Sequence, residues 1–89
     1  MGAVTTKTWS HPRHPMIEAR PLVSFGRPCI SGTKIASCFV ANRYCAGEFE
    51  AEIADHYGVS LDSIRAAIRF ELDASAMRAW RKWRRDVSK

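Results

Sequence analysis

A glycine between two apolar segments is the feature that most constrains the fold of this chain. Gly58 lies four residues after Ala54 and six residues before Ile64, within the stretch from Glu50 to Phe70. Glycine readily adopts the positive φ that ends one helix and redirects the chain. The small Ala54 lets a second helix cross closely, and Ile64 supplies an apolar contact for that crossing. This spacing is typical of a helix-turn-helix, although an ordinary helical hairpin in a protein core uses the same three residue types.

Helices are expected on both sides of this glycine. The earlier one should span residues 48–57, with Phe49, Ile53 and Tyr57 on one face and acidic side chains on the other. That acidic face would repel phosphate. The later helix should begin at Leu61, after a Ser60 whose hydroxyl can cap the free N–H groups. Its inward stripe is expected to contain Leu61, Ile64, Ala67, Ile68, Glu71 and Leu72.

The remaining side chains of the later helix are the candidate DNA-binding residues. In a helix-turn-helix, the first turn of this helix meets base edges. Ser63 can bond several bases, and Arg65 or Arg69 can reach guanine or phosphate. Asp62 can accept a hydrogen bond from a cytosine amine, but an acid in a first turn also complements the helix dipole. The candidates in this segment are Ser60, Asp62, Ser63, Arg65, Ala66 and Arg69.

The positive charge of the chain is concentrated near its C-terminus. Residues 1–73 carry eight basic and eight acidic side chains, so the net charge of +5 arises entirely from residues 74–89. A localised basic segment indicates an anionic partner, usually a nucleic acid. Met77, Trp80 and Trp83 recur at every third residue and predict the buried edge of a fourth helix. The phosphate-contacting candidates here are Arg78, Arg81, Lys82, Arg84 and Arg85.

The first half of the chain is expected to be irregular before it becomes helical. Residues 1–16 show no periodicity and predict a flexible arm, in which Trp9 is out of place. Residues 22–25 and 29–30 suit short extended pieces, with Pro28 restricting any sheet to a small one. Thr33 is a reasonable N-cap for a helix over residues 34–46. Its expected apolar stripe is Ile35, Cys38, Phe39, Ala41, Asn42 and Cys45, with Asn42 the polar exception.

Other features exclude several classes of protein. Cys38 and Cys45 are interpreted as small buried hydrophobic residues rather than redox or metal groups, because the cysteine spacings match no metal motif. No apolar run is long enough to span a bilayer, and no signal peptide is recognisable, so a cytoplasmic protein is expected. No nucleophile–base set has a supporting motif. We therefore expect neither an enzyme nor a bound cofactor.

Several motifs together resemble the small bacterial family known as domain of unknown function 433. The resemblance covers about residues 22–74. It is carried by residues 26–30 (GRPCI), 32–35 (GTKI), 46–47 (AG), 52–54 (EIA), Tyr57 and 64–68 (IRAAI). Family members often have a proline and acids where Glu48 and Phe49 stand here. The family implies a helix-turn-helix domain with a short N-terminal β element, and some members serve as dimeric antitoxins of the VapB type that bind operator DNA.

The sequence therefore predicts a mainly α protein with a homeodomain-like or winged-helix-like helix-turn-helix. Residues 1–16 would form an arm, 17–75 the domain, and 76–89 a basic Trp/Arg helix or tail. The expected function is DNA-binding regulation by a homodimer, since a core of this size is marginal. A toxin is the further partner that the resemblance implies. The alternatives are a protein-binding adaptor that uses the acidic helix with Trp80 and Trp83, or a basic helix lying on a membrane surface.

Overall fold

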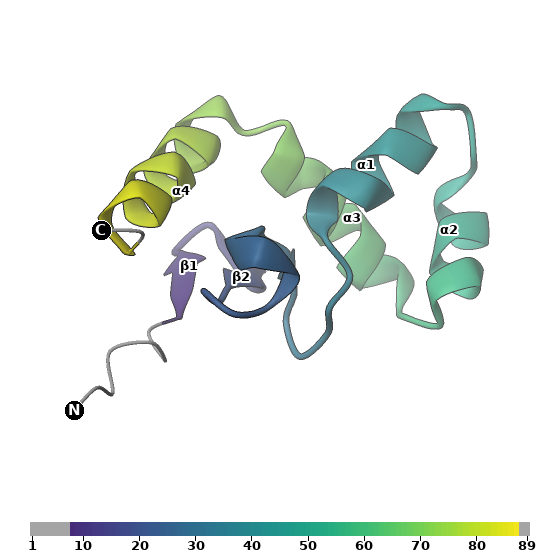
Figure 1. The fold of residues 1–89 in the computed structure, drawn as a ribbon. Helices are drawn as coiled ribbons and strands as arrows, with labels where there is room; N and C mark the ends of the chain where they lie inside the picture. The colour runs from purple at the N-terminus through teal and green to yellow at the C-terminus, as the bar shows by residue number, and fades with distance from the viewer. Residues whose placement is uncertain (1–7, 88–89) are drawn as a thin grey trace.

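The computed structural model describes residues 8–87 and is mainly helical, with a small three-stranded antiparallel sheet near the N-terminus (Figure 1). The strands are β1 (Trp9–His11), β2 (His14–Ala19) and β3 (Cys29–Ile30), in the order β1-β2-β3. The helices are α1 (Ser37–Cys45), α2 (Glu50–Tyr57), α3 (Leu61–Glu71) and α4 (Ala74–Val87). A 3-10 turn, η2 (Ser24–Gly26), lies between β2 and β3. None of the helices in this part of the chain is long and apolar enough to cross a membrane.

The hairpin of β1 and β2 corrects the expectation of a flexible arm over residues 1–16. Trp9 pairs with Ala19 and His11 with His14, so residues 9–16 are ordered, whereas residues 1–7 lie outside the described structure. The indole of Trp9 lies 5.9 Å from the ring of Phe70, centroid to centroid. Because this contact joins residues far apart in the sequence, local periodicity could not reveal it.

The prediction of an extended piece at residues 22–25 is also wrong, whereas the one predicted at 29–30 is confirmed as β3. Ser24 and Phe25 have φ values of 49° and 59°, in the left-handed region. Strand formation is impossible there, although the residue types favour it. β3 pairs with β2 through Ile17 opposite Ile30, which places both side chains in the core.

Helix α1 begins later than expected and buries a different stripe. Its N-cap is Ala36 rather than Thr33, whose hydroxyl instead bonds to the backbone of Ile30 and Ile35. The buried side chains of α1 are those of Ser37 and Val40. The expected burial of a whole stripe is wrong, because Cys45, Asn42 and Phe39 are exposed while Cys38 is half-buried.

Helix α2 begins at Glu50, and Phe49 is its N-cap rather than part of its buried face. The Phe49 side chain is exposed, while Ile53 and Ala54 are buried and Tyr57 is half-buried. The expected contribution of Phe49 to the core is therefore wrong, and the expected contribution of Ile53 is confirmed.

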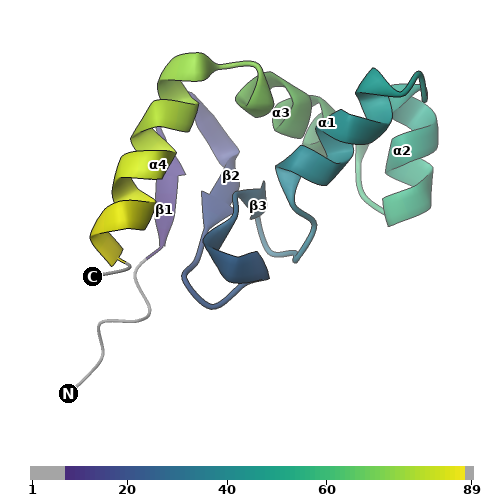
Figure 2. The same cartoon turned by 45° about the horizontal axis from the view of Figure 1, so that its top comes forward.

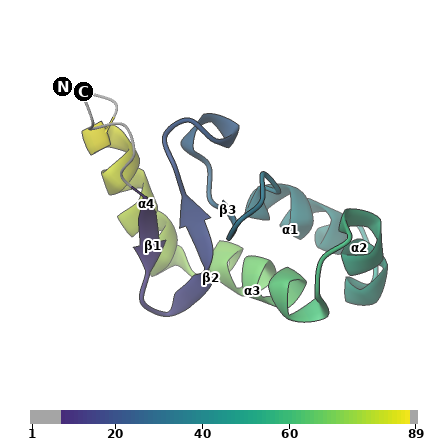
Figure 3. The same ribbon diagram turned by 90° about the horizontal axis from the view of Figure 1, so that it is seen from below.

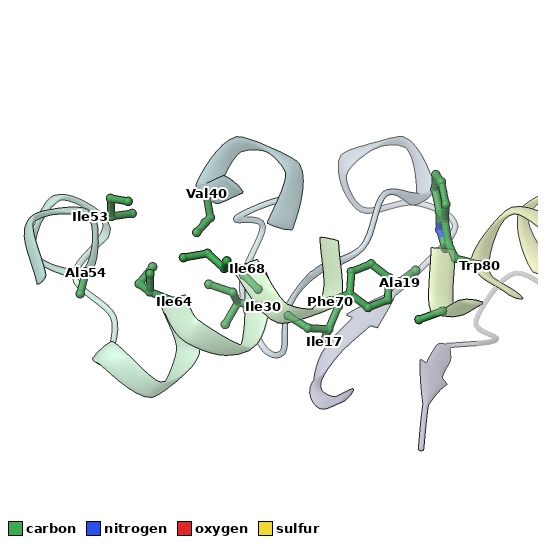
Figure 4. Packing of buried hydrophobic residues seen from close by; sticks show 12 residues of the cluster. Ile17, Ala19, Ile30, Val40, Ile53, Ala54, Ile64, Ile68, Phe70 and Trp80 are labelled. Atoms are coloured by element: carbon green, nitrogen blue, oxygen red, sulfur yellow. The ribbon is translucent and has the colours of Figure 1, made fainter. Parts of the chain in front are cut away.

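Helix α3 is the centre of the molecule and packs against α1, α2, α4, β2 and β3. Figure 4 shows the buried side chains as a row along this helix, from Ile53 and Ala54 at one end to Trp80 at the other. The burial expected for Ile64, Ala67 and Ile68 is confirmed. Leu72 was expected inside and is exposed. Phe70, which the predicted stripe omitted, is fully buried because it faces the hairpin rather than α1.

Helix α4 turns back along the hairpin, so that β1 and α4 lie side by side (Figures 1 and 2). Its expected buried edge is confirmed: Trp80 is buried, and Met77 and Trp83 pack against the core. The Trp80 indole N–H donates to the carbonyl oxygen of Gly26 over 3.0 Å, which joins α4 to η2. The tryptophans are therefore covered within one chain and give no reason to require a second subunit.

Candidate nucleic-acid interface

The turn between α2 and α3 has the geometry expected from its sequence. Gly58 is left-handed, with φ of 70° and ψ of 33°, and its N–H donates to the carbonyls of Ala54 and Asp55. Ser60 is the N-cap of α3 and accepts a hydrogen bond from the backbone N–H of Ser63 over 3.1 Å. The predicted roles of Gly58 and Ser60 are thus confirmed. The two helices are joined by only Gly58, Val59 and Ser60.

One edge of α3 remains open to solvent. Asp62, Arg65, Arg69 and Leu72 are exposed, and their spacing of three and four residues places them in one line along the helix. Arg69 forms no ion pair with any described residue, whereas the Nε of Arg65 lies 3.1 Å from a carboxylate oxygen of Glu50 at the start of α2. Two guanidinium groups therefore lie one helical turn apart on this open edge.

Two of the candidates on α3 are less available than the sequence indicates. Ala66 was predicted to contact DNA, and this prediction is wrong because its side chain is buried inside the fold. The Ser63 hydroxyl lies 2.9 Å from the Ser60 hydroxyl, so one of the two hydroxyls donates to the other. Ser60 and Ser63 together cap the N-terminus of α3.

The cations of α4 lie on the side of the helix opposite its buried edge. Arg78, Arg81, Lys82 and Arg85 follow the spacing of one helical face, and all are exposed. No ion pair links these side chains to another residue within 8–87. Arg84 differs, because its guanidinium lies over the ring of Trp80 at 5.5 Å from the centroid.

The structure separates these two sets of candidates. Viewed from below, α4 lies beyond one end of α3 and α2 beside the other (Figure 3). The domain is elongated, with extents of 44 × 25 × 20 Å. The exposed edge of α3 and the basic face of α4 therefore lie on two different helices, which are joined by Leu72 and Asp73.

A carboxylate that the sequence reasoning missed connects the hairpin to the helices. Asp73 accepts hydrogen bonds from the side chains of His14 (2.8 Å) and Arg13 (3.0 Å) and from the backbone N–H of Ala76 (3.1 Å). Because these donors favour the charged form, the pKa of Asp73 is held well below its ordinary value of 3.8. No local signal could have found this cluster, since His14 and Asp73 are 59 residues apart.

The two tryptophans suggested for a protein-binding adaptor are not a free surface, whereas Glu52 and Asp55 on the acidic helix α2 are exposed. Trp80 is buried, and the indole N–H of Trp83 is buried without a hydrogen-bond partner in the described structure. The apolar face of α4 is likewise used inside the protein.

A solved structure is similar to part of this chain. The crystal structure of Rv2018 from Mycobacterium tuberculosis matches with a TM-score of 0.53 and 29% sequence identity, over 58% of this chain and 24% of that one. The present chain thus corresponds to about a quarter of the length of Rv2018. No curated protein matches the sequence significantly.

The family comparison covers the segment that contains β3 and the first three helices. Residues 17–70, more than half of the chain, match the model of the family described as "Protein of unknown function (DUF433)". This agrees with the motifs at residues 26–35 and 52–68. The chain belongs to the DUF433 family.

Proposed function

We propose that this protein is a DNA-binding regulator in which α2, the Gly58 turn and α3 form a helix-turn-helix. The observation that carries the proposal is the open edge of α3, where Arg65 and Arg69 follow a glycine turn and a serine cap. A helix in this position can enter the major groove, where arginine bonds guanine through two N–H groups.

The ion pair between Arg65 and Glu50 is weak enough for DNA to displace it. An exposed pair contributes about 0–1 kcal/mol. A bidentate arginine–guanine contact contributes about 1–3 kcal/mol of discrimination. Exchange of Glu50 for a guanine edge is therefore favourable, and until DNA arrives the carboxylate keeps Arg65 on the correct side of α3.

The basic face of α4 would contact phosphates. Four cations without an ion pair among residues 8–87, on a helix whose opposite face is anchored in the core, form a rigid, purely electrostatic surface. Such contacts position a protein on DNA without reading its sequence. The location of the two sets on different helices suits this division, since one helix would read bases while the other holds the backbone nearby.

A homodimer is the assembly in which a helix-turn-helix usually reads a palindromic site. We propose this state for the DNA-bound protein. Light scattering with and without a selected duplex would give its mass, and one monomer per duplex would contradict it. An antitoxin role, implied by the family resemblance, would be a special case of the same regulator.

The proposal is tested by selection from a pool of random-sequence duplexes, followed by gel-shift titration of the enriched sequence. Replacing Arg65 and Arg69 with Gln should weaken binding by about tenfold or more, because two guanidinium groups no longer meet bases or phosphates. The matched control replaces Arg20 and Lys34 with Gln, which removes the same charge from another part of the fold. Equal weakening in both variants, or no enriched sequence at all, would contradict reading by α3.

A further inference from the structure

The turn η2 holds an aromatic side chain in solvent at the expense of backbone strain. Ser24, Phe25 and Gly26 all have positive φ, at 49°, 59° and 80°, although only glycine adopts this region without strain. Two hydrogen bonds fix the turn. The Trp80 indole N–H donates to the carbonyl oxygen of Gly26, and the Ser24 hydroxyl donates to the carbonyl oxygen of Lys34. The Phe25 side chain is 80% exposed and adds nothing to the core.

A second exposed phenylalanine lies beside this turn, with an arginine between the two rings. The guanidinium carbon of Arg27 is 5.8 Å from the ring centroid of Phe25 and 5.7 Å from that of Phe39, at the start of α1. Phe39 is 50% exposed, and Leu22, three residues before Phe25, is 82% exposed. We call Phe25, Arg27 and Phe39 the aromatic–arginine patch.

Packing within the chain does not account for this patch. Glycine in place of Phe25 would relieve the backbone strain of its positive φ. Large exposed apolar side chains also favour aggregation, so an exposed phenylalanine here has a cost to the protein. Strain that the surrounding structure maintains is characteristic of functional positions. Aromatic residues and arginine are also the types that contribute most to protein interfaces. The patch therefore has the composition of a binding surface, separate from the open edge of α3.

The charges at the patch define the chemistry of its partner. The Arg27 side chain makes no ion pair or hydrogen bond with any described residue, so its N–H edges are free while its faces lie against the rings. Lys34 nearby is exposed, whereas Arg20 is paired with Glu18 at 3.3 Å. A free guanidinium edge matches the two oxygens of a carboxylate.

We propose that the aromatic–arginine patch binds an acidic, apolar polypeptide segment. A carboxylate of the partner pairs with Arg27, and its apolar side chains cover Phe25 and Phe39. A second copy of this chain fits less well, because symmetric association would bring two uncompensated Arg27 groups together. Single-stranded nucleic acid fits less well too, since Arg27 and the nearby Lys34 supply, among residues 8–87, few cations at this patch to follow a phosphate backbone.

The test is selection on the full chain from a displayed library of random peptides about 12 residues long. The enriched peptides are then measured by fluorescence anisotropy. Enrichment is expected for peptides with Asp or Glu within a few positions of Leu, Phe or Trp. Phe25→Asn and Arg27→Gln should each weaken their binding by about tenfold.

Two features of the variants make the result interpretable. Asparagine tolerates the left-handed region, so Phe25→Asn should melt at the wild-type temperature or above it. The matched control is Phe49→Ser, which removes another exposed phenylalanine and supplies an N-cap hydroxyl to α2. This variant should bind the peptides with wild-type affinity.

Several results would overturn the proposal. These are the absence of enriched peptides, enrichment without acids, or binding that Phe25→Asn leaves unchanged. Binding of an oligo-dT of about 12 nucleotides that depends on Phe25 would show base stacking instead. A doubled mass that Phe25→Asn abolishes would show that a second copy occupies the patch. Gel shifts with duplex DNA test a different face, so this proposal and the proposed function can fail separately.

Discussion

At the scale of single residues, Glu50 has two effects on the proposed DNA surface. Its carboxylate holds Arg65 at the open edge of α3, and it also adds negative charge where phosphates would approach. The exposed ion pair is worth no more than about 1 kcal/mol, which corresponds to about fivefold in affinity. Removal of the charge should therefore help binding more than the freedom gained by Arg65 harms it.

We expect Glu50→Gln to tighten the selected duplex by about two- to fivefold in gel-shift titrations at low salt. Asp55→Asn is the matched control, because Asp55 is an exposed acid on the same helix without an ion pair among residues 8–87. If Asp55→Asn tightens binding equally, only net charge is involved and Arg65 has no special position.

Asp73 gives the fold a dependence on pH whose sign follows from its hydrogen bonds. Its pKa is lower in the folded state than in the unfolded chain, so the folded state binds a proton less readily. The resulting stabilisation is complete above the ordinary value of 3.8 and is lost as pH falls below it. Asp73→Asn should thus melt below the wild type at pH 7, and the difference should shrink below about pH 4.

Thermal unfolding of both proteins between pH 7 and pH 3 measures this difference. Asp55→Asn, which lacks the contacts of Asp73 with His14 and Arg13, is expected to show no such trend. A constant difference between Asp73→Asn and the wild type across the range would contradict the low pKa.

At the scale of elements, the sequence predicted the helices on both sides of Gly58 because their signals are local. A glycine turn, a serine cap and a periodic apolar stripe all act within about ten residues. The hairpin could not be predicted in this way, since Trp9 and His14 are held by Phe70 and Asp73. The buried face of α3 is wider than predicted for a related reason. Elements distant in the sequence pack on several sides of this helix and bury Ala66 and Phe70 as well as the expected stripe.

The candidate DNA-binding residues were predicted unevenly. Charged side chains such as Arg69 and Arg78 lie in solvent as expected, because burial of an unpaired guanidinium is costly. Ala66 could not be placed from its sequence, since alanine suits both the surface and the core. Leu72 and Cys45 were misplaced because helix ends at the margin of a small domain leave apolar residues uncovered.

The basic face of helix α4 lowers the stability of the folded protein, because its like charges repel one another. Arg78, Arg81, Lys82 and Arg85 form four like-charge pairs at spacings of three and four residues, each destabilising by roughly 0.2–0.5 kcal/mol at low salt. Replacing Arg78, Arg81 and Lys82 with Gln removes all four pairs and keeps Arg85 to interact with the helix dipole. This variant should be more stable than the wild type by about 1–2 kcal/mol at low salt.

Unfolding followed by circular dichroism at low and high salt measures this change, and the difference should vanish at high salt through screening. The same variant should flatten the plot of log affinity for DNA against log salt by about 0.9 units for each phosphate that is no longer neutralised. A wild-type slope would remove α4 from the DNA surface. Deletion of the helix would not replace this experiment, because it also removes Trp80 and Trp83 from the core.

At the scale of the whole molecule, the three tryptophans lie together at the hairpin and α4, whereas α1 and α2 lie at the other end of α3. Tryptophan fluorescence therefore reports one end of the domain, and far-ultraviolet circular dichroism reports all four helices. The buried side chains form a single cluster along α3. We expect the two signals to show one coincident thermal transition, as a cooperative domain requires.

An earlier transition in fluorescence would mean that α4 leaves the core while the other helices persist. Trp9→Phe provides a check, because it removes the indole that lies beside both Phe70 and Trp83 but keeps a ring at that position. The fluorescence of the two remaining tryptophans should still change in a single transition, whose midpoint lies at a somewhat lower temperature than in the wild type.

The position of Phe70 also bears on how such domains diverge. The family match ends at this residue, yet its ring is covered by Trp9 and His14, which precede residue 17. A relative that shares only the matched segment has to shield the same ring with side chains of another origin. β1 and α4, with the cations of α4, lie outside the matched segment, whereas the Gly58 turn and the arginines of α3 lie within it.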